Sequence, residues 1–586
     1  MSHKVQVVDE DNKLIKTIDA KDGELLHSIL VHEHGYHAPC GGNRTCKKCK
    51  VRIKNSMFYT ADEMHILSKE ERQEGVHFAC MLRVTEDMTI ELQSQAYQIA
   101  QTIYEEKDMV DPIIRRTHLS LKELKSRVRT DYITALKKQM YIEHVSLEVV
   151  KRVPQLILSE IDEVVIMHDE NKIVGITEKL EEGYGIAIDI GTTTVVSYLY
   201  NLSTGQYKDV ISDINHQKNF GFDVIARIKH AHEARGLEVL QQAIVSQLNE
   251  MIESLLKKNN LHSQQLDQVV VVGNTVMMHL FAGVNPKDIG AAPFTPVFTE
   301  AIYTKAVNFG LRASAHCRIL LLPAIAAYVG ADIVGGMIAA KMYEGDACIL
   351  LVDIGTNGEI ALLNHHQMTC CATAAGPAFE GANITYGVGG VQGAINKIFN
   401  NSGKLCYTTI NEKKPIGICG SGLIDGIAYM LEKGYIDETG YLEGDDLAEI
   451  DQMTALKITE SLYYPSIYIT QKDIREIQLA KGSIRAGIET MMDESGIEVG
   501  AIDKVYIAGG FGSYMDKESA VKIGLLPKGL EHKIVSIGNA AGIGAVKVLL
   551  NKDYLKRVME IKEKCQYVEL SNSVKFMEHY MESMSF

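Results

Sequence analysis

Four cysteines near the start of the chain have a spacing that can hold a metal cluster. Five residues separate Cys40 from Cys46, two separate Cys46 from Cys49, and thirty separate Cys49 from Cys80. Three cysteines on one loop and a distant fourth are typical of a [2Fe–2S] cluster, in which four thiolates hold two irons. The glycine pair after Cys40 permits the tight turn because glycine has no Cβ. The spacing therefore predicts a [2Fe–2S] cluster with these four cysteines as metal ligands.

Other uses of these cysteines are less favoured. A zinc site would give two pairs of cysteines at short spacing, and only Cys46 and Cys49 form such a pair. A secreted disulfide framework is not expected for 11 cysteines, an odd number, in 586 residues. The other seven cysteines, from Cys317 onward, we expect to be small buried side chains. A Rieske centre would use histidines, but four cysteines already suffice, so we interpret the nearby histidines as loop or surface residues: His27, His32, His34 and His37.

A second group of residues has the chemistry of a phosphate site. Residues 189–194, Asp-Ile-Gly-Thr-Thr-Thr, follow an apolar strand and are echoed about 165 residues later at 353–357, Asp-Ile-Gly-Thr-Asn. A glycine turn after a strand brings backbone amides and hydroxyls close to phosphate. An aspartate at the end of a strand can reach Mg²⁺ or its water. A repeat at this spacing predicts two related halves whose loops clamp the phosphates between them.

These two loops and one later strand supply the predicted nucleotide contacts. Asp189 and Asp353 are the predicted catalytic residues, which hold Mg²⁺ or orient the attacking water. The strand at 505–508 ends at a glycine pair, where a flat adenosine can approach the backbone. The predicted nucleotide-binding residues are Gly191, Thr192, Thr193, Thr194, Gly355, Thr356, Asn357, Gly509 and Gly510.

The motifs of other nucleotide sites are missing from the chain, and two carboxylates stay unassigned. There is no Walker A sequence, and the glycines between 387 and 393 do not have the Gly-x-Gly-x-x-Gly spacing, which argues against a Rossmann dinucleotide site. Glu380 lies beside Gly-Pro and Asp425 beside Gly-Ser-Gly. For both residues, a place in the nucleotide cleft and a place on a solvated turn remain open.

Length, composition and charge limit the class of protein. A chain of 586 residues favours three or four domains. No stretch reaches the roughly 18 uncharged apolar residues of a membrane helix, and residues 1–10 alternate like a strand rather than forming a signal peptide. A net charge of −15 argues against a broad nucleic-acid surface. We therefore expect a cytoplasmic protein with neither a nucleic-acid partner nor a membrane.

Taken together, these motifs carry a family resemblance. Residues 189–194, 353–357 and 508–512 resemble the phosphate-one, phosphate-two and adenosine motifs of the superfamily of actin, sugar kinases and heat-shock chaperones, the ASKHA ATPases. Behind an N-terminal ferredoxin domain, this arrangement is similar to the reductive activators of corrinoid proteins. The chain departs from that family at Arg44 and Lys47, where glycine is expected, which affects neither ligation nor fold. Further segments typical of that group are 221–225, 272–275, 374–381 and 419–425.

The resemblance spans essentially the whole chain and implies its fold. The expected fold class is multidomain, with an α+β β-grasp ferredoxin-like domain, a small mixed α/β middle domain and a two-lobed α/β actin-like ATPase domain. The expected bounds are 1–95 for the ferredoxin domain, 96–115 for a linker, 116–182 for the middle domain, 183–345 for the first lobe and 346–586 for the second. Local patterns predict hairpins at 5–18 and 164–176, helices at 25–31, 119–128 and 145–153, and a closing strand at 84–92.

The resemblance also implies a reaction, one-electron reduction of Co(II) to Co(I) in a corrinoid protein, driven by ATP hydrolysis, which reactivates a methyltransferase or O-demethylase system. The implied cofactors are a [2Fe–2S] cluster, ATP and Mg²⁺. The implied partners are the corrinoid protein and an upstream electron donor, with a homodimer as one option, in an anaerobic host. Three alternatives stay open: an ATP-coupled donor to another low-potential acceptor, such as the activators of 2-hydroxyacyl-CoA dehydratases; a redox-sensing, nucleotide-dependent scaffold; and a sugar or acid kinase with an added redox domain.

Overall fold

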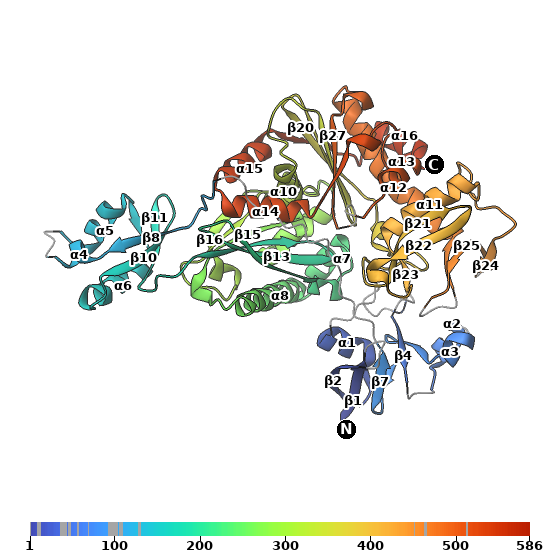
Figure 1. Ribbon diagram of the computed structural model, residues 1–586, viewed down its shortest axis with the longest axis horizontal. Coiled ribbons are helices and arrows are strands. Elements are labelled where there is room, and N and C mark those ends of the chain that lie inside the picture. The colour runs from blue at the N-terminus through green and yellow to red at the C-terminus, as the bar shows by residue number, and fades with distance from the viewer. Residues whose placement is uncertain are drawn as a thin grey trace.

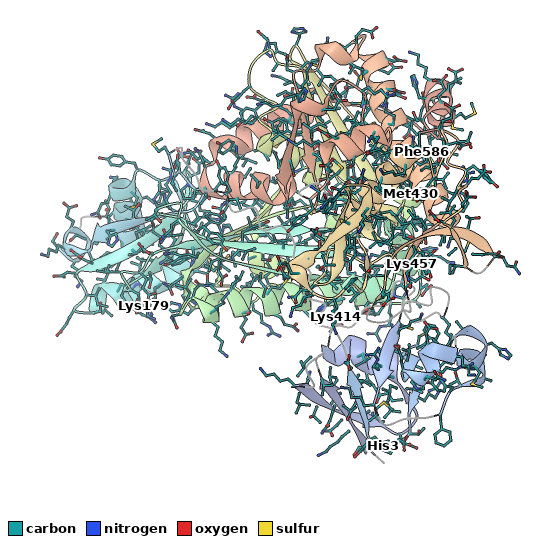
Figure 2. The ribbon with its side chains drawn as sticks, turned by 45° about the vertical axis from the view of Figure 1, so that its right-hand side comes forward. His3, Lys179, Lys414, Met430, Lys457 and Phe586 are labelled. Atoms are coloured by element: carbon teal, nitrogen blue, oxygen red, sulfur yellow. The ribbon has the colours of Figure 1, made fainter. Side chains whose placement is uncertain are left out.

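Figure 1 presents the computed structural model, in which an N-terminal sheet, a small middle unit and two larger halves follow one another along the chain. This arrangement confirms the expected multidomain fold class. Figure 2 labels His3 in the N-terminal unit and Lys179 beside the middle unit, at separate ends of the molecule. The structure describes residues 2–8, 13–34, 44, 49–54, 58–67, 69–91, 104, 109–126, 130–450, 452–461, 466–510 and 514–586.

The N-terminal unit is built on a sheet with the strand order β2-β1-β7-β4-β5. Strand β1 (Ser2–Val8) pairs antiparallel with β2 (Leu14–Lys21) and parallel with β7 (Met88–Glu91), which is the β-grasp arrangement. Helix α1 (Leu26–His34) buries Leu26, Ile29 and Leu30 in the core of this unit. The predicted hairpin and helix are thus confirmed. The other elements are β3 (Glu24–Leu25), β4 (Lys50–Ile53), α2 (Ala61–Ile66), α3 (Lys69–Gln73), β5 (Val76–Phe78) and β6 (Arg83–Val84).

The closing strand predicted at 84–92 is two strands in the structure. Residue Val84 belongs to β6, which pairs with β3, and the turn at 85–87 separates it from β7, which pairs with β1 and β4. The alternation of apolar residues continues across the turn, so the pattern alone did not reveal the change of partner strand.

The middle unit has a four-stranded sheet in the order β8-β10-β11-β9, and Figure 1 shows it projecting from the two larger halves. The predicted hairpin is confirmed as β10 (Glu163–His168) and β11 (Lys172–Thr177), which pair antiparallel. The remaining elements are β8 (Arg115–Ser120), α4 (Lys122–Lys125), α5 (Tyr132–Met140), β9 (His144–Val145) and α6 (Leu147–Leu158).

Both predicted helices of the middle unit need correction at their starts. Leu119 lies in β8, where it pairs with Val164, and the helix covers only Lys122–Lys125 of the described part of 119–128. Val145 pairs in β9, and α6 begins two residues later. A short apolar run fits a strand and a helix equally well, and pairing with β10 and β11 decides in favour of strands here. Most of the predicted linker at 96–115 lies outside the described residues.

A buried ion pair attaches the middle unit to the first half. Arg116 of β8 places its Nε 2.7 Å from Oδ2 of Asp267, whose side chain is only 1% exposed. His316 also contacts this carboxylate, with 3.0 Å between its Nε2 and Oδ1 of Asp267. Since a buried carboxylate without a partner is costly, the pair holds the two units together.

The two halves repeat one topology. The first has the sheet β14-β13-β12-β15-β17-β16, and the second has β28-β27-β18-β19-β20-β29. Each motif strand pairs antiparallel with the next strand, β12 with β13 and β18 with β19, and parallel with a later one, β15 and β27. The order β14-β13-β12-β15-β17 therefore matches β20-β19-β18-β27-β28, and the predicted relation of two halves is confirmed. The strands are β12 (Tyr184–Ile190), β13 (Thr194–Asn201), β14 (Tyr207–Ile214), β15 (Leu266–Gly273), β16 (Ile302–Lys305), β17 (Arg318–Leu321), β18 (Ile349–Ile354), β19 (Gly358–Asn364), β20 (Gln367–Thr373), β27 (Lys504–Ala508), β28 (Ile534–Gly538) and β29 (Cys565–Tyr567).

Two helices pack between these sheets. Helix α10 (Ala331–Ala339) leaves the first half, and α14 (Ala540–Leu550) follows β28 of the second. They cross at glycines: a Cβ on Gly544 would collide with the carbonyl oxygen of Gly335. This close backbone approach, which only glycine allows, sets the distance between the two halves.

The remaining helices and strands cover the sheets or extend the second half. No helix in the described part of the chain is long and apolar enough to cross a membrane. The elements not yet given are α7 (Val224–Ala231), α8 (Gly236–Lys258), α9 (Thr275–Ala282), β21 (Ala394–Asn401), β22 (Lys404–Thr409), β23 (Gly417–Ile418), α11 (Gly420–Lys433), β24 (Ala448–Ile450), β25 (Met453–Thr459), β26 (Ile467–Thr470), α12 (Gln471–Glu494), α13 (Lys517–Lys522), α15 (Asp553–Lys564) and α16 (Val574–Glu582).

Candidate functional site

The candidate site is a cavity of about 310 Å³ between the two halves. All the residues predicted to be catalytic or to bind nucleotide line this one cavity, although they come from three distant segments of the chain. They are Asp189, Gly191, Thr192, Thr193, Thr194, Asp353, Gly355, Thr356, Asn357, Gly509 and Gly510. Their roles toward a nucleotide stay predictions, but the geometry brings them together as those roles require.

The first loop, residues 191–194, is held from outside the cavity. Asn215 binds it twice: its side-chain amide donates to the Gly191 carbonyl (2.8 Å) and its backbone N–H donates to the Thr193 carbonyl (2.9 Å). The buried guanidinium of Arg227 donates to the Thr192 carbonyl. Neither Asn215 nor Arg227 lines the cavity. These hydrogen bonds hold the backbone of the loop from outside the cavity, while Thr192, Thr193 and Thr194 line it.

The second loop and the late glycine pair are packed against each other. Gly355 donates its N–H to the Asn357 carbonyl (3.0 Å), which closes a tight turn. Gly509 has a φ of +92°, and a Cβ there would lie 2.9 Å from Oδ1 of Asp353 and 2.6 Å from the Ile354 carbonyl oxygen. Glycine is needed at 509 because both the backbone angle and the contact with Asp353 exclude a side chain.

Five carboxyl groups from the two halves line the cavity: Asp189, Asp332, Asp353, Glu359 and Glu380. Burial, with repulsion by Asp332, raises the pKa of Asp189 and of Asp353 to about 7 each. Burial also raises the pKa of Asp332 to about 6. Burial and repulsion by Asp332 and Asp353 raise the pKa of Glu359 well above its usual range. A cation bound among these crowded carboxyl groups would favour their ionised form.

The sequence analysis missed three charged residues of the cavity: Asp332, Glu359 and Lys218. Glu359 had a signal, because a hairpin over the second motif puts it directly opposite Asp353, as the structure does. Asp332 stands in the first turn of α10, where an acidic residue is common for capping alone. Lys218 is the one lysine or arginine among the described lining residues, and burial lowers its pKa.

The two unassigned carboxylates have different environments. Glu380 lines the cavity, and its carboxylate accepts hydrogen bonds from the hydroxyls of Thr193 (2.8 Å) and Thr356 (3.0 Å). Asp425 does not line the cavity and lies buried in α11, where burial raises its pKa to about 6. The interpretation as solvated turn residues is therefore wrong for Asp425, and the cleft interpretation is confirmed for Glu380.

Two of the four predicted cluster ligands lie in the described residues. Cys49 precedes β4 and Cys80 follows β5, and their buried Sγ atoms are 3.0 Å apart. This is longer than the roughly 2.05 Å of a disulfide bond, so no disulfide joins these two cysteines. The Cys80 N–H points at Sγ of Cys49 (3.5 Å). Two buried thiols that converge in a β-grasp fold fit their share of a [2Fe–2S] ligand set. Cys40 and Cys46 lie outside the described residues.

The structure tests the expectations for the other cysteines and for one histidine. His27 is buried rather than on a loop or surface, and burial lowers its pKa, so the expectation is wrong there. The side chains of His32, His34 and His37 lie outside the description. Burial is confirmed for six of the seven later cysteines, and Cys406 is partly exposed. The six are Cys317, Cys348, Cys370, Cys371, Cys419 and Cys565.

Comparisons with known proteins agree with this geometry. The chain matches family models described as a 2Fe-2S iron-sulfur cluster binding domain over residues 9–85, the RACo middle region over 184–345, and the C-terminal domain of RACo, the ASKHA domain, over 347–586. The corrinoid activation enzyme RamQ of Eubacterium limosum is 34% identical over 570 residues, which cover 93% of each chain.

Two further relatives are similar over most of the chain. The [Co(II) methylated amine-specific corrinoid protein] reductase of Methanosarcina barkeri is 27% identical over 436 residues, which are 69% of this chain and 77% of that protein. A solved structure of a reductive activator for a corrinoid, iron-sulfur protein has a TM-score of 0.75 and 31% identity, and covers 100% of this chain and 98% of that one. The chain therefore belongs to the family of reductive activators of corrinoid proteins.

Proposed function

We propose that this protein uses ATP hydrolysis to drive the one-electron reduction of a corrinoid protein from Co(II) to Co(I). The observation that carries the proposal is the presence, in one chain of this family, of a converging thiol pair in a β-grasp unit and of a cavity flanked by two Asp-x-Gly-Thr loops. The first feature suits electron transfer and the second suits phosphate chemistry.

In this proposal Cys40, Cys46, Cys49 and Cys80 hold a [2Fe–2S] cluster. When bound, such a cluster supplies one-electron chemistry, at about −400 mV in plant-type ferredoxins. The residues of this chain bury the two described thiols in the core of the N-terminal unit, which keeps water away from them. Arg44, which lies between Cys40 and Cys46 in the sequence, forms an ion pair with Asp62 of α2 (3.6 Å).

In the nucleotide site, Asp189 and Asp353 would hold Mg²⁺ directly or through water. Mg²⁺ usually takes one or two carboxylates and completes its shell with phosphate oxygens and water. Thr192, Thr193, Thr356 and Asn357 would contact the phosphates, and Gly509 and Gly510 would face the adenosine.

Coupling is needed because Co(II) is hard to reduce. Each 59 mV by which the reduction potential of the acceptor lies below that of the donor lowers the equilibrium constant of a one-electron transfer about tenfold. Closure of the two halves around ATP would change their grip on the corrinoid protein, and loss of an axial ligand to cobalt would raise its potential. The proposed partners are the corrinoid protein and an upstream electron donor. A homodimer is the proposed option for self-association.

The alternatives are less favoured. Activators of 2-hydroxyacyl-CoA dehydratases share a [4Fe–4S] cluster between subunits, whereas this chain has its own β-grasp unit with two converging thiols. A kinase would need a positioned base beside a pocket for a small substrate, and the sequence motifs identify neither. A redox-sensing scaffold would transfer no electron to its partner.

Visible spectra test the proposal. The reduced protein is mixed anaerobically with the Co(II) form of a corrinoid protein of a methyltransferase system, with and without Mg-ATP. Appearance of the Co(I) band only with ATP is the expected result. Co(I) formed equally without ATP would refute the coupling, and no Co(I) with an intact cluster would favour another acceptor or the scaffold.

A further inference from the structure

One side chain in the cavity connects the two halves directly. The Glu380 carboxylate accepts a hydrogen bond from Thr193 of the first half through Oε2 (2.8 Å) and from Thr356 of the second half through Oε1 (3.0 Å). Thr356 directly follows Gly355, Thr193 is the second residue after Gly191, and both threonines are predicted phosphate contacts. The carboxylate therefore takes hydrogen bonds from the very hydroxyls that a phosphate would use.

The backbone holds Glu380 in this place. It ends a short 3₁₀ helix (Pro377–Glu380) whose Phe379 is buried in the core of the second half. The next residue, Gly381, has a φ of +80°, and a Cβ there would lie 2.5 Å from the Val388 carbonyl oxygen. Because this turn is packed so closely, we expect displacement of the carboxylate to come from rotation of the Glu380 side chain rather than from movement of the backbone.

The hydrogen bonds of Glu380 and those of a phosphate exclude each other. A threonine hydroxyl has a single hydrogen to donate, and carboxylates and phosphates are both acceptors. Two anions also repel each other in a cavity that already contains Asp189, Asp332 and Asp353. A phosphate that binds Thr193 and Thr356 must therefore displace the carboxylate of Glu380.

We propose that Glu380 is a latch, an internal anion that occupies the phosphate position between Thr193 and Thr356, joins the two halves in the nucleotide-free protein, and is displaced by an entering phosphate group. This inference rests on the proposed nucleotide function. It makes Glu380 a competitor of the ligand rather than one of its ligands. The latch also links phosphate entry to movement between the halves, because displacing Glu380 removes a bond that joins them.

The latch is tested by whether substitution of Glu380 tightens or weakens the binding of Mg-ATP. Calorimetry measures the Kd of Mg-ATP for the full-length protein and for Glu380→Ala and Glu380→Gln. Removing the competitor should tighten ATP binding about ten-fold in Glu380→Ala, the scale of a charge-assisted hydrogen bond, and less in Glu380→Gln, whose amide still accepts one bond. Unchanged or weaker binding in Glu380→Ala, with a native circular dichroism spectrum, would overturn the latch.

A second background separates the latch from simple charge repulsion. In Thr193→Val/Thr356→Val there is no hydroxyl to compete for, so adding Glu380→Ala should give little further gain. An equal gain in both backgrounds would mean that charge alone acts, and would refute the latch.

ADP and inorganic phosphate identify the displacing group. A gain with ATP alone assigns the latch to the terminal phosphate, whereas a gain with inorganic phosphate assigns it to a free phosphate, and both results support displacement. Wild-type protein that binds no Mg-ATP would instead refute the proposed function, so the two failures are distinguishable.

Discussion

The N-terminal unit and the nucleotide cavity hold their reactive groups in different ways. The predicted cluster ligands lie within 40–80, and the two described ones meet where β4 begins and β5 ends. The cavity is lined by residues from 189 to 541, which two separate halves contribute. The first site depends on one loop and one core, and the second on how two halves are held together. A substitution that disturbs the packing between the halves should therefore lower ATP hydrolysis and leave the cysteine site of the N-terminal unit intact.

The largest effect is expected from breaking the thiol site. Cys80→Ser should abolish the visible absorption of the cluster and Co(I) formation, because a serine replaces a buried thiolate ligand. ATP hydrolysis should persist, since no residue of the cavity changes. Cys406→Ser, which alters a partly exposed cysteine of the second half, is the control and should keep the spectrum. Loss of ATP hydrolysis in Cys80→Ser would contradict the separation of the two sites.

Substitution of a carboxylate in the cavity should lower ATP turnover and leave the cluster intact. Asp353→Asn removes a carboxylate at the point where the second loop meets Gly509, and ATP turnover should fall roughly 10³-fold. The cluster spectrum should not change. Asp425→Asn removes a buried carboxylate of the same half that does not line the cavity, and it should retain turnover. Equal turnover in Asp353→Asn and wild type, measured by phosphate release, would remove Asp353 from the site.

The next effect concerns attachment of the middle unit. Arg116→Ala leaves Asp267 buried with only His316 beside it, and the free energy of unfolding should fall by about 3–5 kcal/mol. The neighbouring Arg115 forms a partly exposed pair with Asp111, so Arg115→Ala should cost only about 1 kcal/mol or less. Urea unfolding checks both variants. Equal losses would mean that burial of the Arg116 pair is not what stabilises the junction.

The smallest effect tests the distance between the halves. Gly544→Ala forces a methyl group against the Gly335 carbonyl, which should destabilise the assembled halves by about 1–3 kcal/mol. ATP turnover should drop while the cluster spectrum stays the same. Gly500→Ala, at a glycine with open space around it, is the matched control. A spectral change in Gly544→Ala without any change in turnover would contradict the contrast between the two regions.

The features that could be predicted from the sequence are those marked by a repeated motif or by a characteristic spacing of residues. The cysteine spacing and the two Asp-x-Gly-Thr loops are local, so their residues could be named before the fold was known. Asp332 could not, because it enters the cavity only through the crossing of α10 between the halves. Leu119 and Val145 were assigned to helices because pairing with distant strands, which a local pattern does not contain, decides their structure.

The contrast between the two regions implies that two separate sites, the cluster and the nucleotide cavity, act in one coupled reaction. The most direct test records cluster oxidation and Co(I) formation together, after Mg-ATP is added to the reduced protein and a Co(II) corrinoid protein. The account predicts that both changes begin only with ATP and proceed one for one. Cluster oxidation without ATP, or Co(I) formation without cluster oxidation, would contradict it.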